Sequence, residues 1–356
     1  MGAPAYPGRV DGGVRMSDRG LVASPGGHGP LWAVAVTSGS TSLTMSVVIP
    51  TVGRSVLTDV VAAVLGPDQF GESDEGCRLL ELILVADRSR IVVGREVASG
   101  NPHGDDRVRI IDGPGRGPAW ARQLGLDAAR GDVVLFLDDD VLPGPGLLGG
   151  HCRAHRESPD RVVVGYMPVA PECRSRSVPA TIYHNDYETE CSLYAADSAE
   201  VLRGLWGGNV SMRRANAVRV PQAVEAHRFR SREDEEFGFR CLRAGLIGYF
   251  DRSLAAEHWF DRPVSGFLRS AGDQARAGSY LADRYPDLFV GVPVDAASPL
   301  LRVIGRVARI GSLGRGMRRA TEGLARRFGD GPPTWARVRL VVLARFFVQL
   351  EVERRG

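Results

Sequence analysis

Residues 135–141 read Leu135-Phe136-Leu137-Asp138-Asp139-Asp140-Val141, an apolar strand that ends in three consecutive carboxylates. A run of like charge at a strand end is costly unless something neutralises it. The usual neutraliser is a divalent metal that holds a phosphate-bearing ligand. A second acidic cluster, Glu233-Asp234-Glu235-Glu236, lies in the second half of the chain. The two clusters together predict a metal site and a general base.

Apolar strands and helices alternate on both sides of this stretch. We expect strands at residues 47–49, 80–85, 108–111, 133–137 and 161–166, and helices at residues 56–65 and 118–129. Near-continuous apolar strands separated by helices predict a parallel sheet that is covered on both faces. The ligand of such a sheet lies beyond the carboxyl ends of the strands. Asp87, Asp112 and Asp138 lie at or just beyond such ends, so we expect them to converge.

The second half of the chain has a looser pattern. Residues 168–205 contain several aromatic side chains without a clear period, and we expect an irregular region there. Gly and Pro end helices, and Gly245 and Pro286 each follow a helical pattern. Helices are therefore predicted at residues 233–244, 264–284, 299–328 and 335–352, of which the last two are basic and amphipathic.

Composition limits the organisation of the chain. Its 356 residues suffice for one large domain or two ordinary ones, and its 44% hydrophobic content supports a sizeable core. Residues 1–44 are rich in Gly, Ser, Pro and Ala without periodicity, and we expect a disordered extension. The five cysteines lack C-x-x-C spacing, which favours reduced thiols. No run of 18 apolar residues occurs, and the apolar run at 31–36 is too short for a signal peptide, so we expect a cytoplasmic protein.

Charge is distributed unevenly along the chain. The net charge is +3, but from Leu300 to the end 13 Arg stand against four acids, an excess of +9. A basic amphipathic helix can lie on an anionic membrane surface, here the inner face of the membrane. It can equally pack its apolar side on the acidic body of the protein or form a solvated face. Nucleic-acid binding is not expected, because the basic stretch contains no recognised module.

Several motifs, in this order and spacing, resemble the family 2 glycosyltransferases with the GT-A fold. They are the opening strand Ser46–Arg54, the Ala-x-Ala-Arg helix at Ala119–Leu126, the D-x-D strand at Phe136–Val141, the Gly-Asn segment at Gly207–Arg214 and the Glu-Asp segment at Glu233–Arg240, which Gly245 and His258 follow. The resemblance covers about residues 45–290. It implies an α/β fold with a mainly parallel sheet flanked by helices. The basic amphipathic pattern after this domain predicts a C-terminal helical extension at 291–356. A donor-binding half at 45–142 and an acceptor half at 143–290 would form the domain.

The resemblance also implies a reaction and its residues. A sugar would move from a nucleotide-diphosphate donor to an acceptor hydroxyl, with Mg²⁺ or Mn²⁺ as the cofactor. The residues implied to bind the donor are Pro50, Thr51, Arg54, Asp87, Arg122, Asp138 and Asp139. Those implied to hold the metal are Asp138, Asp140 and His258. Those implied on the acceptor side are Gly208, Asn209 and Glu236, and irregular region 168–205 would shape the acceptor pocket.

The chemistry of the acids supports these roles independently. Asp138 and Asp140 are two residues apart, so both can reach one side of a strand end. A departing diphosphate carries charge that a metal must offset, and such metals prefer carboxylate oxygens. The plainer alternative is a solvated acidic turn, which fits poorly after so apolar a strand. His258 is open to a structural interpretation as well as to a role at the metal or diphosphate.

Asp234 is the expected general base, which removes the proton from the acceptor hydroxyl during attack. An acid that opens a helix also suits the helix dipole without any catalytic role. Glu233 and Glu236 remain alternatives for the base. A single base on the face opposite the leaving group implies inversion at the anomeric carbon, and a retaining mechanism is the alternative.

Two departures from the family pattern and two rival classes bear on function. The family usually has two adjacent acids where this chain has Ala86 and Asp87, so recognition of the nucleotide base is in doubt. In the Ala-x-Ala-Arg helix, Gln123 stands where the family has Asn. A non-catalytic sugar-nucleotide-binding protein on the same fold would have broken acidic motifs, and these are intact. A nucleotidyltransferase would show a Gly-rich, Lys-containing signature, and this chain contains no Lys. The Gly113–Pro118 turn lacks the dinucleotide-binding spacing.

Overall fold

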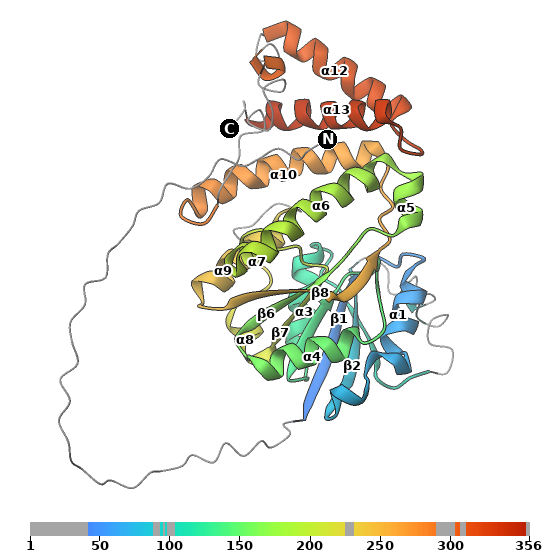
Figure 1. The fold of residues 1–356 in the computed structure, drawn as a ribbon, viewed down its shortest axis with the longest axis vertical. Coiled ribbons are helices and arrows are strands. Elements are labelled where there is room, and N and C mark those ends of the chain that lie inside the picture. Colours follow the sequence, from blue (N-terminus) through green and yellow to red (C-terminus); the bar gives the residue numbers. More distant parts are fainter. Residues whose placement is uncertain are drawn as a thin grey trace, which may run out of the picture. The chain divides into compact units, whose positions relative to one another are not determined.

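The computed structural model describes residues 42–87, 93–94, 97, 104–224, 231–289, 303–306 and 311–353. Within these ranges the chain forms an eight-stranded sheet with the order β3-β2-β1-β4-β7-β6-β8-β5 (Figure 1). The strands are β1 (Leu43–Thr51), β2 (Cys77–Ala86), β3 (Val108–Asp112), β4 (Val133–Leu137), β5 (Val141–Pro143), β6 (Arg161–Tyr166), β7 (Asn209–Arg213) and β8 (Ile247–His258). The predicted α/β fold of the GT-A type is confirmed.

The sheet has a parallel part and a mixed part. Strands β3, β2, β1 and β4 are parallel neighbours, as the sequence predicts. Strand β7 lies antiparallel between β4 and β6, β8 runs parallel to β6, and β5 pairs antiparallel with β8. Strands β5, β7 and β8 were not among the predicted elements. They bring residues from the second half of the chain beside the acidic end of β4.

Alternating side chains of β1 divide the core into two faces. Val47 and Ile49 pack with α1 (Leu57–Leu65) and α4 (Leu147–Glu157), while Val48 faces the opposite side. That side is covered by α3 (Pro118–Ala128), α7 (Ser198–Arg203), α8 (Arg214–Arg219) and α9 (Glu233–Arg243). Gly125 lets α3 approach β1 closely, because a Cβ at that position would lie 2.2 Å from Cγ1 of Val48.

The carboxyl ends of the parallel strands meet, as the topology predicts. The Asp87 N–H after β2 donates to the Thr51 carbonyl at the end of β1 (2.9 Å). The Asp138 N–H after β4 donates to the carbonyl of Gly208 (3.1 Å), which precedes β7. These bonds bring three strand ends and the Gly207-Gly208 segment together at one edge of the sheet.

The expectation of an irregular region at 168–205 is wrong. This region forms α5 (Pro171–Arg176), α6 (Val178–Ala196) and α7, and Ser177 and Asp197 cap α6 and α7 through side-chain oxygens. In α6 the buried positions Tyr187, Cys191 and Tyr194 share the helix with a polar stripe. Because two sides of the helix pack against protein, the apolar residues do not form the single stripe that marks an amphipathic helix.

The C-terminal helices pack on the domain. Helix α13 (Trp335–Glu353) contacts α10 (Val264–Arg284), α12 (Gly311–Phe328) and α6 (Figure 1). Val341 and Ala344 of α13 are fully buried in one cluster with Val264, Phe267 and Leu268 of α10. The apolar side of α13 is therefore covered by protein, as the packing alternative predicts, while membrane contact through exposed residues of the tail stays a prediction. The domain boundary at residue 290 stays a prediction.

The N-terminal boundary differs slightly from the expected one. Strand β1 begins at Leu43, which is buried, and Thr44 hydrogen-bonds to Asp132 through both its N–H and its hydroxyl. Residues 43 and 44 thus belong to the sheet and not to the disordered extension predicted at 1–44. Residues 1–41 lie outside the described ranges. All five cysteines are free, as predicted. None of the helices in the described ranges is long and apolar enough to cross a membrane.

Candidate active site

A cleft of about 440 Å³ opens at the carboxyl ends of the strands. Asp138, Gly207, Gly208, Asp234 and His258 line its floor and near wall. Residues of α6, α10 and α13 line the part farther from the sheet. The two acidic clusters that the sequence predicts to work together therefore face the same space.

Asp138 lies at the centre of the floor. Its Oδ1 accepts a hydrogen bond from Nη2 of Arg122 (2.6 Å), a buried residue of α3. Burial raises the pKa of Asp138, but the Arg122 guanidinium outweighs it, so that the pKa lies below its usual value. Gly208 must lack a side chain, since a Cβ there would lie 2.9 Å from Oδ2 of Asp138. Asp138 is thus an ionised carboxylate in a fixed position at the cleft.

Asp139 and Asp140 point to different partners. Asp139 is buried and accepts hydrogen bonds from the Thr51 hydroxyl (2.7 Å) and the Val52 N–H (3.2 Å), and burial raises its pKa despite the nearby Arg54. Asp140 forms an ion pair with Arg54, which also reaches Oδ1 of Asp139 (3.3 Å). Arg54 and Thr51 therefore bind the acidic strand end. Asp139 connects that strand end to the loop after β1 by hydrogen bonds.

His258 ends β8 and faces Asp140. Its Nε2 lies 3.6 Å from Oδ2 of Asp140, and Tyr183 and Phe260 meet its ring edge-on. Burial lowers the pKa of His258 to about 4, although the Asp138 charge acts in the opposite direction. The imidazole is therefore neutral at pH 7 and able to act as a ligand.

The predicted metal ligands share one end of the sheet, but they are not arranged around a common point. Across the described ranges, no three His, Cys, Asp or Glu side chains already form a metal-binding group. The Arg54 guanidinium satisfies the Asp140 charge instead. The chemistry of the set nevertheless fits a hard divalent ion, since carboxylate oxygens and a neutral imidazole are ligands that Mn²⁺ accepts.

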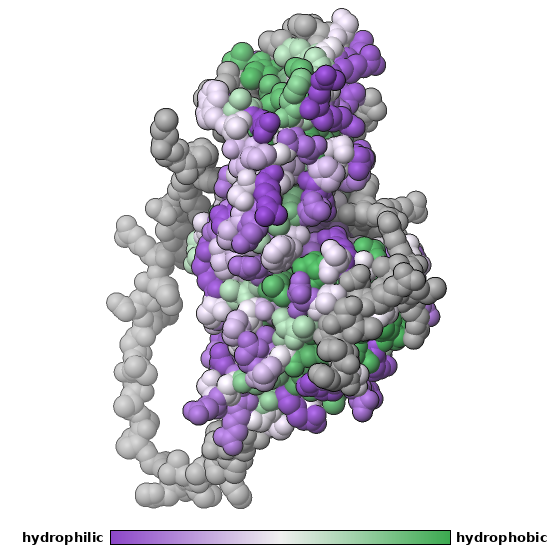
Figure 2. Space-filling view, turned by 90° about the vertical axis from the view of Figure 1, so that its right-hand side faces the viewer, coloured by the Kyte–Doolittle hydropathy of each residue, from purple (hydrophilic) through white to green (hydrophobic). Residues whose placement is uncertain are grey.

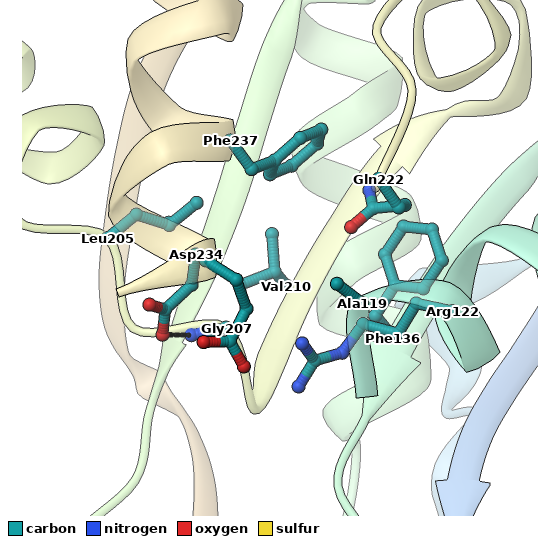
Figure 3. A pocket seen from close by; sticks show the side chains of 10 residues that line it. Ala119, Arg122, Phe136, Leu205, Gly207, Val210, Gln222, Asp234 and Phe237 are labelled. Atoms are coloured by element: carbon teal, nitrogen blue, oxygen red, sulfur yellow. Dashed lines mark hydrogen bonds between the residues drawn. The ribbon is translucent and has the colours of Figure 1, made fainter. Parts of the chain in front are cut away.

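Asp234 faces this floor from the N-terminus of α9. Its Oδ2 accepts a hydrogen bond from the Gly207 N–H (3.0 Å), the dashed line in Figure 3. Figure 3 also shows Arg122 of α3 pointing from the opposite element toward the same space. Gly207 leaves room for this contact, because a Cβ there would lie 3.1 Å from Cβ of Asp234. One backbone segment, Gly207-Gly208, thus positions both Asp138 and Asp234.

Burial makes three acids at the start of α9, Glu233, Asp234 and Glu235, weaker than usual. It raises the pKa of Asp234 against the opposing effect of Arg122. Burial and the neighbouring Asp234 raise the pKa of Glu233 to about 7. Burial likewise raises the pKa of Glu235 to about 8, although Arg232 forms an ion pair with it (2.9 Å). A carboxylate with a raised pKa is a better proton acceptor than an ordinary one.

Two predicted acceptor-side residues lie elsewhere. The Asn209 side chain is fully buried, where its Oδ1 meets Nε2 of His151 (2.9 Å) and its Nδ2 donates to the Leu254 carbonyl (3.1 Å). Glu236 is buried as well, and it accepts hydrogen bonds from Arg240 and Tyr285. Both side chains join structural elements and do not line the cleft, so the interpretation of Asn209 and Glu236 as acceptor-facing is corrected. The Asn follows Gly208 on a strand, where adjacent residues face opposite sides.

Asp87 and Pro50 also support the backbone. Asp87 accepts hydrogen bonds from the N–H groups of Gly115 (2.8 Å) and Gly117 (3.0 Å), which fixes the turn before α3. Pro50 is buried within β1 beside Val85. The roles of both residues toward the donor stay predictions.

Sequence reasoning expected region 168–205 to shape the acceptor pocket, but it named no individual residue of the distal lining of the cleft. That lining includes Tyr183, Asp186 and Glu190 of α6, and Arg345 and Gln349 of α13. The signal that could have found the first group is its spacing of three and four residues, which places it on one helix face. No local pattern could have found the second group, because it depends on how α13 packs.

A family model and a solved structure agree with this description. The family model described as "Glycosyl transferase family 2" matches residues 46–217. A mannosyltransferase from Pyrobaculum calidifontis, solved with GDP-Man and Mn²⁺, has a similar fold (TM-score 0.51, 14% identity, 87% of this chain and 86% of that chain). GalNAc-T7, solved with UDP, GalNAc and Mn²⁺, aligns with a TM-score of 0.48 and 16% identity over 69% of this chain and 49% of its own. No curated protein matches the chain.

The fold and the family match define a glycosyltransferase of the GT-A class. Within that class, residues 46–217 match the model of glycosyl transferase family 2.

Proposed function

We propose that the protein transfers a sugar from a nucleotide-diphosphate donor to an acceptor hydroxyl, with a divalent metal at the donor. The carrying observation is that Asp138 and Asp234 face one cleft and are both held by the Gly207-Gly208 segment. The intact acids argue against the alternative of a non-catalytic sugar-nucleotide-binding protein. The cleft is also large enough for a ligand of substrate size.

Asp138, Asp140 and His258 would hold the metal, and Mg²⁺ and Mn²⁺ are both compatible with these ligands. When bound, the ion would offset charge on the departing diphosphate. Arg54 would then release Asp140, and its guanidinium is well placed to meet a phosphate, since its side chain is 44% exposed. Arg122 keeps Asp138 ionised in either state.

Asp234 would accept the proton of the attacking acceptor hydroxyl. It has one Oδ fixed by the Gly207 N–H, so its orientation is defined before the substrate arrives. Glu233 shares the same helix turn and remains the alternative base. One base opposite the leaving group favours inversion at the anomeric carbon, and retention is the alternative outcome.

Donor binding tests the proposal directly. Calorimetry with a panel of nucleoside diphosphates and nucleotide sugars, each with Mn²⁺, should identify one that binds. The Asp140→Asn variant keeps the side-chain shape but removes the charge, and its affinity for that ligand with Mn²⁺ should be at least tenfold lower. Asp132→Asn, an acid at the opposite strand end of β4, serves as the matched control. Wild-type affinity in a folded Asp140→Asn protein would reject Asp140 as a ligand.

We also propose that the C-terminal helices bring the enzyme to an anionic membrane surface. Leu324, Phe328 and Trp335 are exposed, Trp335 by 71%. Arg327 and Arg339 lie over the rings of Phe328 (5.4 Å) and Trp335 (3.7 Å). Figure 2 shows apolar and hydrophilic surface next to each other over these upper helices. Aromatic rings beside cationic groups suit the interface of an anionic bilayer, and each basic residue there adds about 1 kcal/mol.

Sedimentation with vesicles tests this second proposal. The protein should pellet with phosphatidylcholine vesicles that contain phosphatidylglycerol, and added salt should release it because salt screens the charges. Phe328→Ala with Trp335→Ala should weaken the binding. Ile247→Ala, an exposed apolar residue on β8, is the control. Absence of pelleting at low salt would reject the proposal.

A further inference from the structure

Three helices extend the cleft away from Asp234. Helix α6 contributes Asp186 and Glu190, α10 contributes Ser270 and Gln274, and α13 contributes Arg345 and Gln349. All of these side chains carry hydrogen-bonding groups, and they come from parts of the chain as distant as residues 186 and 349. We call this part of the cleft the distal groove.

Helix geometry gives the distal groove its length. Its α6 lining runs from Tyr183 to Glu190 and its α10 lining runs from Phe267 to Gln274. Each pair is seven residues apart, which is about 10 Å along a helix. A row of polar groups of that length exceeds what one small acceptor group needs.

Two ion pairs lie within the lining of the cleft, and Arg262, the other arginine of that lining, donates a hydrogen bond to Ser270 (3.1 Å). Arg345 forms an ion pair with Asp186, and Arg232 forms one with Glu235. Burial raises the pKa of Glu190 to about 7, so that much of it is uncharged. A charged acceptor would have to compete with these pairs, whereas a neutral one would not. Gln274 and Gln349 make no side-chain hydrogen bond to another residue in the described ranges, and each amide offers two donors and one acceptor oxygen.

An aromatic platform lies where the distal groove meets the floor. The rings of Tyr183 and Trp206 are 4.8 Å apart, the ring of Tyr187 also lies 4.8 Å from that of Trp206, and both Tyr183 and Trp206 line the cleft. A rigid apolar face next to many hydrogen-bonding groups matches the two surfaces of a sugar ring, its C–H face and its hydroxyls. Aromatic rings with a few placed polar groups are typical of small-molecule sites.

We infer that the acceptor is a neutral chain of two or more sugar units, bound along the distal groove with its reacting hydroxyl at Asp234. The inference rests on the proposed function. The C-terminal helix α13 is then part of the acceptor site, and Arg345 and Gln349 determine specificity. Asp186 is a positioning residue, since it holds Arg345.

Acceptor length is the experimental variable. Transfer is measured to glucose, mannose and the malto-, cello- and manno-oligosaccharides of two to four units, with the donor found by calorimetry. The KM for the preferred series should fall at least tenfold between one and three units. Gln349→Ala and Arg345→Ala should remove most of this gain while kcat on the monosaccharide is retained.

Two controls separate the outcomes. Arg276→Ala, an exposed arginine of α10 outside the cleft lining, should behave like wild type, and the melting temperature of each variant reports folding. Calorimetric binding of a nucleotide sugar with Mn²⁺ reports the proposed function alone, so absence of any such binding in the wild type would refute that function. Donor binding with no transfer to any oligosaccharide, a KM independent of length, or a preference for phosphorylated sugars would overturn the inference. The inference would also be overturned if the KM of the Gln349→Ala enzyme fell with acceptor length as much as that of the wild type.

Discussion

The two ends of the cleft are built in different ways. At the donor end, the acids follow β4 directly and are held by partners at the neighbouring strand ends, as Asp139 is by Thr51 and Asp140 by Arg54. At the distal end, Glu190, Gln274 and Gln349 come from three helices that are far apart in sequence. The donor end is therefore determined by the sheet topology, and the distal end by helix packing. Conserving one strand order while changing helix packing would change the acceptor without altering the donor chemistry.

The carboxyl pKa values also differ between the two sides of the cleft. Arg122 keeps the pKa of Asp138 low in spite of its burial, which suits a group that offsets positive charge. Burial raises the pKa values of Asp234, Glu233 and Glu235 on the opposite side. Such a separation of carboxyl pKa values assigns a permanently charged role to one side and a proton-transfer role to the other.

The sharpest test of this division removes the base. We expect Asp234→Asn to lower kcat by a factor on the order of 10² to 10⁴, the usual range for a lost general base, and to leave donor affinity unchanged. Steady-state kinetics and calorimetry measure the two quantities. Glu236→Gln, which alters a structural acid on the same helix, should lower the melting temperature and leave kcat close to the wild-type value. Near-normal turnover in Asp234→Asn together with a loss in Glu233→Gln would transfer the role to Glu233.

Removal of the C-terminal helices tests whether the distal region is an independent addition. A chain that ends at residue 299 would expose Val264, Phe267 and Leu268, which are buried in one cluster with Val341 and Ala344. Full burial of such side chains is worth about 1.5 to 3 kcal/mol each, so the truncated protein should be insoluble or melt far below the wild type. Soluble expression and a thermal melt provide the measurement. A stable, active 1–299 protein would show that α13 is dispensable for the fold.

The sequence predicted the donor end well for a physical reason. Continuous apolar strands such as Val133–Leu137 and Arg161–Tyr166 are buried on both faces, and their bounds agree with the structure to the residue. Residues just beyond such strands converge by topology, so Asp87 and Asp138 could be placed at one edge without any model of packing. The individual partners could not be predicted. Asp139 and Asp140 are adjacent and alike, and only the position of Arg54 and Thr51 distinguishes them.

The acceptor side was predicted less well because its signals are not local. Asn209 and Glu236 belong to motifs that face the cleft, yet their own side chains point into the protein, since neighbouring positions on a strand or helix face different sides. Helix α6 carries polar residues along one side and buried aromatic residues along another, which hid its period. Arg345 lines the cleft only because α13 packs on α6, where Arg345 pairs with Asp186, a residue 159 positions earlier in the chain.

The pH dependence of stability tests the burial of the distal acids. Burial raises the pKa of Glu190 to about 7 from an ordinary 4.5, so the folded state holds a proton that the unfolded state releases between those values. Its contribution is complete below pH 4.5 and is lost as the pH rises through 7. Glu190→Gln should therefore raise the melting temperature more at pH 8 than at pH 5.

Glu188 on the same helix gives an opposite control. Burial acts to raise the pKa of Glu188, but Tyr166 and Arg252 lower it overall, so its contribution exists above its ordinary pKa and is lost in acid. Glu188→Gln should then lower the melting temperature more at pH 8 than at pH 3, and its effect should hardly change between pH 8 and pH 5. Equal responses of the two variants at pH 8 and at pH 5 would contradict the assigned protonation states.

The smallest expected effect concerns the N-terminal boundary, where local pairing replaces distant packing. A chain that begins at Ser42 should match the full protein in melting temperature and activity. A chain that begins at Met45 loses the buried Leu43 and the hydrogen bonds from Thr44 to Asp132. It should melt a few degrees lower, because one apolar side chain and two hydrogen bonds contribute only about 1 to 4 kcal/mol together. Its kcat should be unchanged, since these contacts lie at the end of β1 opposite to Thr51. Thermal melts of the two chains, side by side, measure the difference. A loss of activity in the chain from Ser42 would instead show that residues 1–41 contribute to the enzyme.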